Sequence, residues 1–119
     1  MEKVLYVDDE AINLMLFKAN FKKTFTVITG ISGFEGLELL AQHPDVRVVI
    51  SDMKMPGMNG IEFIKKAKTE YPHLIFYILT GFDITPEIEE ALATGLIAEY
   101  YSKPFNVREL ESAILRALD

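Results

Sequence analysis

The sequence predicts an α/β domain in which five strands alternate with five helices, building a doubly wound parallel sheet in the order 2-1-3-4-5. Two observations favour this fold. Short apolar runs without polar alternation recur along the chain, as expected of strands that are covered on both faces. Helix-start signals follow most of these runs, so that each strand is paired with a helix. The 119 residues fit one domain, over residues 1–119, with no output domain in the chain.

The expected strands are apolar runs rich in β-branched and aromatic residues. They are Val4–Val7, Phe25–Thr29, Val46–Ile50, Leu74–Leu79 and Ile97–Tyr101. Because short parallel strands need crossover connections, helices are expected between them on both faces of the sheet.

The helices are expected from their start and stop signals. The first spans Glu10 to about Lys22, with apolar residues at helical spacing that include Ile12, Met15, Leu16 and Ala19. Capping-box spacing joins Ser32 to Glu35, Asn59 to Glu62 and Asn106 to Glu109, and Thr85-Pro86-Glu87 is a further helix start. Pro44 and Pro72 mark helix ends, and the final helix runs from Val107 to about Leu118.

Composition excludes several classes of function. The net charge of −6 argues against a nucleic-acid surface and favours a neutral or basic protein partner. The chain has no cysteine, which excludes disulfides, thiolate catalysis and zinc–thiolate sites. There is no apolar run of membrane-spanning length and no signal-peptide pattern at the N-terminus, so a cytosolic domain without membrane contact is expected.

Polar residues stand at the carboxyl ends of the predicted strands. Asp8 and Asp9 follow the first strand, Asp52 the third, Thr80 the fourth, and Lys103-Pro104 the fifth. In the order 2-1-3-4-5 the first and third strands are neighbours, and ligands bind at the carboxyl ends near this switch point. The three aspartates should therefore converge in one cleft beside Thr80 and Lys103.

Three carboxylates that lie close together repel one another unless their pKa values rise or a cation joins them. Hard oxygen ligands suit Mg²⁺. A carboxylate can also act as a nucleophile that forms an aspartyl phosphate, and phosphoryl transfer needs a metal, an ammonium group and positioned donors to neutralise charge. The chain supplies all of these parts.

Each residue alone has a simpler interpretation. Asp8 and Asp9 could cap the first helix, and Asp52 could be an acid before the Pro56-Gly57 turn. Lys103 could be a surface lysine, and Thr80 a hydroxyl at a strand end. The joint placement at four strand ends favours the functional interpretation.

At this point the sequence resembles the receiver domain of two-component response regulators. The matching motifs are VLYVDDE (Val4–Glu10), VVISDMKMPGMNGIEFI (Val48–Ile64), LTG (Leu79–Gly81) and KPF (Lys103–Phe105), in family order. The resemblance implies a flavodoxin-like (βα)5 three-layer sandwich.

The resemblance also implies roles for individual residues. Asp52 matches the phospho-accepting aspartate, Asp9 a direct Mg²⁺ ligand, Asp8 a ligand acting through water, and Lys54 a ligand through its backbone carbonyl. Thr80 matches the switch hydroxyl, Lys103 the phosphate-pairing lysine and Tyr100 the switch aromatic. Pro104 has a structural role, and the family allows a cis Lys103–Pro104 bond. Lys54 and Phe82 occupy positions at which the family tunes water access.

Two positions depart from the family pattern. Gly81 replaces the usual alanine after the switch threonine, and GLIAEYYSKP (Gly95–Pro104) holds one extra residue, similar to receivers attached to cyclic-dinucleotide phosphodiesterases or found in hybrid kinases.

The function expected from the resemblance is a phosphorylation-activated switch with Mg²⁺ as cofactor. It catalyses only its own phosphorylation and dephosphorylation on Asp52 and is not otherwise an enzyme. The expected donor is a sensor histidine kinase or a phosphotransfer protein. Output to a fused domain or effector, or homodimerisation, would use the face formed by the fourth helix, fifth strand and fifth helix.

Three alternatives belong to other classes. A haloacid-dehalogenase-type phosphatase needs a second aspartate two residues after the nucleophile, where this chain has Lys54. A flavodoxin-like electron carrier needs a Ser/Thr/Gly-rich phosphate loop where this chain has Asp8-Asp9-Glu10. A degenerate receiver that only docks partners would not need the intact key positions.

Overall fold

Strands and helices alternate along the whole chain. The elements are β1 (Lys3–Val7), α1 (Ala11–Phe21), β2 (Thr26–Gly30), α2 (Gly33–Gln42), β3 (Val48–Asp52), α3 (Gly60–Glu70), β4 (Ile75–Thr80), α4 (Pro86–Ala93), β5 (Glu99–Ser102) and α5 (Val107–Leu118). The computed structural model describes residues 1–81 and 83–119, and Phe82, expected to tune water access, lies outside them. The strands pair in parallel in the order β2-β1-β3-β4-β5, which confirms the predicted sheet.

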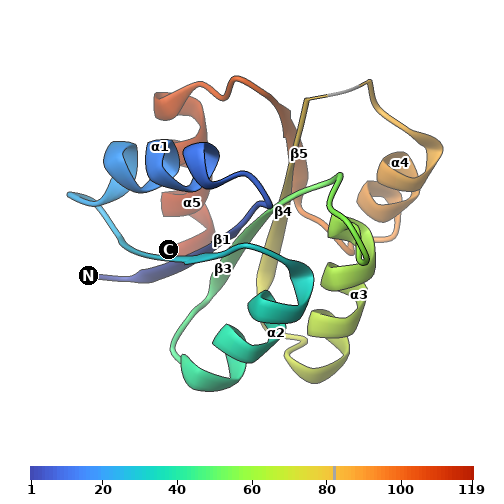
Figure 1. Cartoon of the computed structure of the whole chain (residues 1–119), viewed down its shortest axis with the longest axis horizontal. Coiled ribbons are helices and arrows are strands. Elements are labelled where there is room, and N and C mark those ends of the chain that lie inside the picture. Colours follow the sequence, from blue (N-terminus) through green and yellow to red (C-terminus); the bar gives the residue numbers. More distant parts are fainter. Residues whose placement is uncertain (82) are drawn as a thin grey trace.

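The sheet separates two helical layers (Figure 1). Helices α1 and α5 cover one face, and α2, α3 and α4 cover the other. Along β1, Leu5 and Val7 enter the core under α2 and α3, whereas Val4 and Tyr6 enter the core under α1 and α5. Both faces of the interior strands β1, β3 and β4 are therefore buried, which explains their continuous apolar runs.

Four helices begin at the predicted caps. The side chains of Ser32, Asn59 and Asn106 accept hydrogen bonds from the backbone N–H groups of Glu35, Glu62 and Glu109, and the Thr85 side chain accepts one from Ile88. Asn59 and Glu62 form a reciprocal capping box. At α2 the reciprocal bond is shifted, because Glu35 accepts the N–H of Ile31 and not that of Ser32.

Helix α1 meets the sheet through a different set of residues from those named by spacing. Its buried residues are Leu14, Phe17 and Phe21. The residues Ile12, Met15, Leu16 and Ala19 are exposed. Apolar residues lie on most sides of this helix, so the spacing alone does not select the buried face.

The strands β3 and β5 begin two residues later than expected from the sequence, whereas the bounds of β1, β2 and β4 differ by no more than one residue. The N–H of Val46 donates to the carbonyl of His43, which places Val46 in a turn, and β3 instead extends to Asp52, which pairs with Leu79. In the fifth strand the N–H of Ile97 donates to Ala91 at the end of α4, so pairing with β4 begins later. The shift in β3 makes Asp52 the last residue of the strand.

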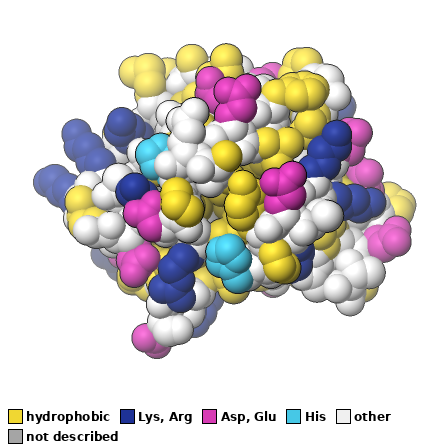
Figure 2. All heavy atoms as spheres, turned by 90° about the horizontal axis from the view of Figure 1, so that it is seen from below, with side chains coloured by type: hydrophobic (Ala, Val, Ile, Leu, Met, Phe, Trp, Pro, Cys, Tyr) yellow, Lys and Arg dark blue, Asp and Glu magenta, His cyan; other side chains and the backbone are white. Residues whose placement is uncertain are grey.

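The face seen from below in Figure 2 carries interspersed acidic, basic and apolar side chains. No single sign of charge gathers there. Over residues 1–81 and 83–119, no helix has both the length and the apolar character needed to cross a bilayer.

Candidate functional site

The two central strands bring the aspartates together. In the register of β1 and β3, Val7 pairs with Ser51, so the next residues, Asp8 and Asp52, lie side by side at the carboxyl edge of the sheet. The N–H of Asp8 donates to the carbonyl of Gly30 at 3.0 Å, which holds Asp8 in line with the end of β2. The predicted convergence of these two acids is therefore present.

Asp8, Asp9 and Asp52 form one carboxylate cluster. Each offers one oxygen, and these oxygens lie within 4.8 Å of one another. Asp8 is fully buried and Asp52 is 7% exposed, whereas Asp9 is open to solvent. The donor set is oxygen only, and one member faces water, an arrangement that fits a hard divalent cation which keeps part of its hydration shell.

Lys103 joins two of these acids. Its Nζ donates to Oδ2 of Asp8 at 2.9 Å and lies 3.1 Å from Oδ1 of Asp52. Burial acts to lower the pKa of Lys103, but the hydrogen bond to Asp8 and the charge of Asp52 outweigh it and raise the pKa. The ammonium group therefore stays charged and partly neutralises the cluster.

The surroundings of Asp52 disfavour the ionised form of its carboxyl group. Burial raises the pKa of this carboxyl, and Lys103 opposes the rise without cancelling it, while Asp8 adds to it. The ionised form of Asp52 is thus less favourable in the folded chain than in water, despite the contact with Lys103. A cation bound by the cluster would relieve this penalty, which is a second reason to regard the cluster as fitting one.

An open cavity of about 350 Å³ gives access to the cluster. Its lining includes Asp9, Asp52, Lys54 and Lys103, together with Glu10, Asn13 and Gly81. On the inner side, the N–H of Gly60 at the start of α3 donates to Met53 at 2.8 Å, and a Cβ at Gly60 would overlap the backbone carbonyl of Asp52. A glycine here lets α3 approach the strand end closely.

The predicted switch residues lie at the neighbouring strand ends. Thr80, the last residue of β4, is buried and lines an open cavity of about 390 Å³ with Lys103. Tyr100 pairs with Ile78 and is half-buried against the core under α4. Because strand residues alternate, Thr80 and Tyr100 share the α4 side of the sheet. Their switching roles remain predictions.

The loop after β5 is fixed next to α1. The Lys103–Pro104 peptide bond is cis, as the family pattern allows. Phe105 follows, and its ring centroid lies 5.7 Å from that of Phe17 and 5.8 Å from that of Phe21. These contacts anchor the segment that carries Lys103.

The sequence analysis missed one residue that contacts the cluster. The hydroxyl of Tyr6 donates to Oδ2 of Asp8 at 2.6 Å. A signal was present, because Tyr6 precedes Asp8 by two residues and strand alternation places both on the same face. A polar group within an otherwise apolar buried run also indicates a specific partner.

Comparisons with known proteins agree with this geometry. The family profile described as "Response regulator receiver domain" matches residues 4–115. Sporulation initiation phosphotransferase F of Bacillus subtilis is 30% identical, over 98% of this chain and 94% of its own length. A cyclic di-GMP phosphodiesterase of Thermotoga maritima is 31% identical, over 97% of this chain but only 30% of its own length. A crystal structure of a response regulator receiver domain protein from Clostridium thermocellum superposes with a TM-score of 0.92 at 33% identity, over 98% of this chain and 94% of the other.

Proposed function

We propose that this chain, which belongs to the response regulator receiver family of two-component systems, is a switch activated by phosphorylation of Asp52. Members of this family are signalling domains rather than conventional enzymes. One observation carries the proposal. Lys103 lies 3.1 Å from Asp52 in a cavity that Asp9 also lines, and it pairs with the buried Asp8 of the same carboxylate cluster. The proposed nucleophile, the ammonium group and the proposed metal ligands therefore lie together.

Mg²⁺ is the cofactor that fits the donor set. Asp9 and Asp52 would bind it directly, Asp8 through water, and Lys54 through its backbone carbonyl. When bound, the ion supplies neutralising charge for the carboxylates and the transferred phosphoryl oxygens.

The proposed reaction transfers a phosphoryl group to Oδ of Asp52. The carboxylate attacks phosphorus, a P–O bond forms, and the bond from phosphorus to the donor nitrogen of a phosphohistidine breaks with its electron pair, which the imidazole retains. Lys103 turns toward the phosphoryl oxygens and stabilises their charge. A sensor histidine kinase or a phosphotransfer protein would present the group in line with Asp52.

The response would then pass to another face of the domain. The Thr80 hydroxyl would donate to the phosphoryl group, and Tyr100, on the same side of the sheet, would turn inward. These movements would alter the face formed by α4, β5 and α5, which an output domain, an effector protein or a second copy of the chain would contact. Phosphate shifts this equilibrium only as far as it binds one state better than the other.

The decisive experiment is labelling by a small phosphodonor. With acetyl phosphate and Mg²⁺, intact-mass spectrometry should show one added phosphoryl group on the unsubstituted chain and none on Asp52→Asn. Asp45→Asn is the matched control, because Asp45 is an exposed acid before the opposite end of β3, and it should be labelled normally. Normal labelling of Asp52→Asn would refute the nucleophile assignment.

A further inference from the structure

Tyr6 is a buried tyrosine whose hydroxyl reaches the carboxylate cluster. Its side chain is 1% exposed, and its ring stacks on Phe17 with centroids 4.2 Å apart and planes 14° from parallel. The hydroxyl donates to Oδ2 of Asp8 at 2.6 Å. A short hydrogen bond to an ionised carboxylate is stronger than one between neutral groups.

Asp8 depends on donors from the protein, because it has no exposure to solvent. Its Oδ1 accepts the backbone N–H of Glu10 at 3.0 Å. Its Oδ2 accepts from both Tyr6 and Lys103, at 2.6 and 2.9 Å. The two donors on Oδ2 therefore share the task of keeping one buried oxygen paired.

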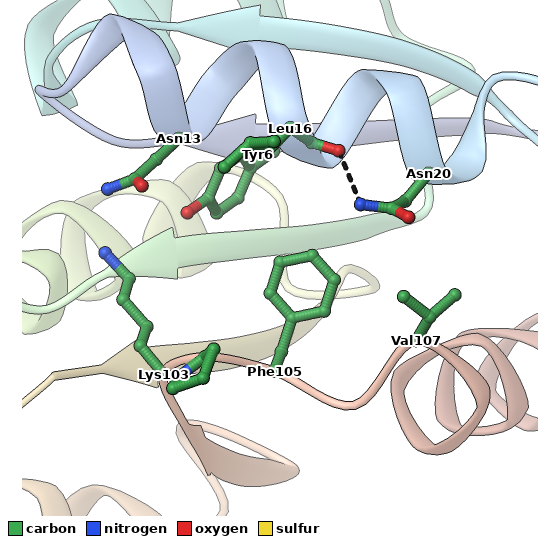
Figure 3. A pocket seen from close by; sticks show the side chains of 8 residues that line it. Tyr6, Asn13, Leu16, Asn20, Lys103, Phe105 and Val107 are labelled. Carbon is green, nitrogen blue, oxygen red and sulfur yellow. Dashed lines mark hydrogen bonds between the residues drawn. The ribbon is translucent and has the colours of Figure 1, made fainter.

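Lys103 is the donor that has to move. In the proposed reaction its ammonium group turns from the cluster toward phosphoryl oxygens on Asp52. Room for this movement exists, because Lys103 and Asp52 both line the open cavity of about 350 Å³ at the cluster. Lys103 also lines a second cavity of about 390 Å³, between α1 and the loop before α5. Figure 3 shows the Tyr6 oxygen and the Lys103 nitrogen directed to the same end of this second cavity, where Asn13 lies.

Departure of Lys103 would remove one donor from a fully buried oxygen. Leaving such an oxygen without a partner is costly, and the hydrogen bond from Tyr6 would keep it paired. Tyr6 lies on β1, an interior strand of the sheet, and its stacked ring fixes its hydroxyl. It can therefore hold Asp8 while Lys103 is elsewhere.

We propose that Tyr6 is a positioning residue for the phosphorylation of Asp52: its hydroxyl keeps Asp8 hydrogen-bonded and oriented while Lys103 transfers to the phosphoryl group. This inference rests on the proposed function. In this role Tyr6 acts through Asp8 and does not contact the phosphoryl group itself.

The test compares two tyrosine-to-phenylalanine variants. Tyr6→Phe removes the hydroxyl that contacts Asp8. Tyr77→Phe is the matched control, because its hydroxyl is also buried but donates at 3.2 Å to the carbonyl of Ala113, on α5. At saturating Mg²⁺, the rate of labelling by acetyl phosphate should fall about tenfold in Tyr6→Phe, the order expected for a buried acceptor that loses its partner. In Tyr77→Phe it should stay within about twofold of the unsubstituted rate.

A second measurement uses the unsubstituted chain and does not depend on activity or on the folding of a variant. The hydroxyl proton of Tyr6 should be visible by NMR as a slowly exchanging signal, since it is buried in a short hydrogen bond. The signal should persist after Asp52 is phosphorylated. Its disappearance on phosphorylation would show that Tyr6 leaves Asp8 together with Lys103, which contradicts the proposal.

The outcomes separate the two proposals. If the unsubstituted chain is labelled on Asp52 and both tyrosine variants react at the same rate, the role of Tyr6 is wrong and the proposed function stands. If the unsubstituted chain takes no label at Asp52, the proposed function is wrong and the role of Tyr6 is wrong with it.

Discussion

Lys103 follows β5 and Asp52 ends β3, yet the Lys103 ammonium group lies 3.1 Å from Oδ1 of the Asp52 carboxylate at the edge of the sheet. The same ammonium group reaches Asp8 at 2.9 Å. One cation thus offsets two acids, while Asp9 remains exposed beside them. The stability and the chemistry of this site are therefore coupled.

Removing the Lys103 charge should destabilise the metal-free protein. In Lys103→Met the free energy of unfolding at pH 7 should fall by about 2 kcal/mol, because the buried Asp8 loses its counter-charge. Mg²⁺ should restore more stability to this variant than to the unsubstituted chain. The control is Lys3→Met, which breaks the surface pair with Asp45 at 3.0 Å and should have only a small effect. Urea unfolding with and without Mg²⁺ measures both variants, and equal losses would contradict the prediction.

The raised pKa of Asp52 predicts a pH dependence of stability. The folded chain holds the Asp52 proton at a higher pH than the unfolded chain does, so folding binds a proton between the two pKa values. The free energy of unfolding should therefore fall as pH rises through that window, and the loss is complete above the folded pKa. In Asp52→Asn the free energy of unfolding lacks the pH dependence that the Asp52 carboxyl contributes. This variant should be more stable than the unsubstituted chain at pH 7 without metal, with the difference vanishing in acid. A variant less stable at pH 7 would oppose this account.

Asp9 should contribute directly to Mg²⁺ affinity. Asp9→Ala should raise the Mg²⁺ dissociation constant by about tenfold or more, since it removes a ligand from the cluster. Glu10→Ala is the matched control, because Glu10 is an exposed acid that lines the same cavity but is not an expected ligand. Titration calorimetry should show a much smaller change in the Mg²⁺ dissociation constant of Glu10→Ala. Similar losses in both variants would mean that general charge, rather than coordination, determines affinity.

Gly60 should be intolerant of even a methyl group. A Cβ at this position would overlap the backbone carbonyl of Asp52 and approach the Ile78 side chain. Gly60→Ala should cost about 2–3 kcal/mol of stability and displace Asp52, so that labelling also slows. Gly81→Ala is the control, because over residues 1–81 and 83–119 the nearest atom to its Cβ would belong to the Lys103 side chain, at 4.0 Å. Thermal unfolding measures the stability of the two variants. Equal stability of Gly60→Ala and Gly81→Ala would contradict the prediction.

Thr80 should transmit the signal without being needed to receive it. Thr80→Ala should still be labelled on Asp52 but should lose the conformational response, because the hydroxyl that would donate to the phosphoryl group is gone. Thr80→Ser keeps a hydroxyl and should retain the response. Amide chemical shifts of α4 and β5, recorded with and without beryllofluoride and Mg²⁺, provide the measurement. A full response in Thr80→Ala would show that the signal takes another route.

The sequence alone determined the features that depend on neighbouring residues. Continuous apolar runs indicated strands buried on both faces, and the residues at Ser32, Asn59, Thr85 and Asn106 marked helix starts because each satisfies a backbone N–H within its own first turn. The order of the elements then placed Asp8 and Asp52 at adjacent strand ends.

Only the tertiary structure decided which groups touch. Helix α1 is apolar on most sides, and packing against the sheet selected Leu14, Phe17 and Phe21 for burial and left Ile12, Met15 and Leu16 exposed. The bond from Tyr6 to Asp8, and the sharing of one Asp8 oxygen with Lys103, depend on how β1 and the loop after β5 meet. Burial and distance are properties of the folded chain, because they arise between segments that are remote in sequence and are brought together by packing.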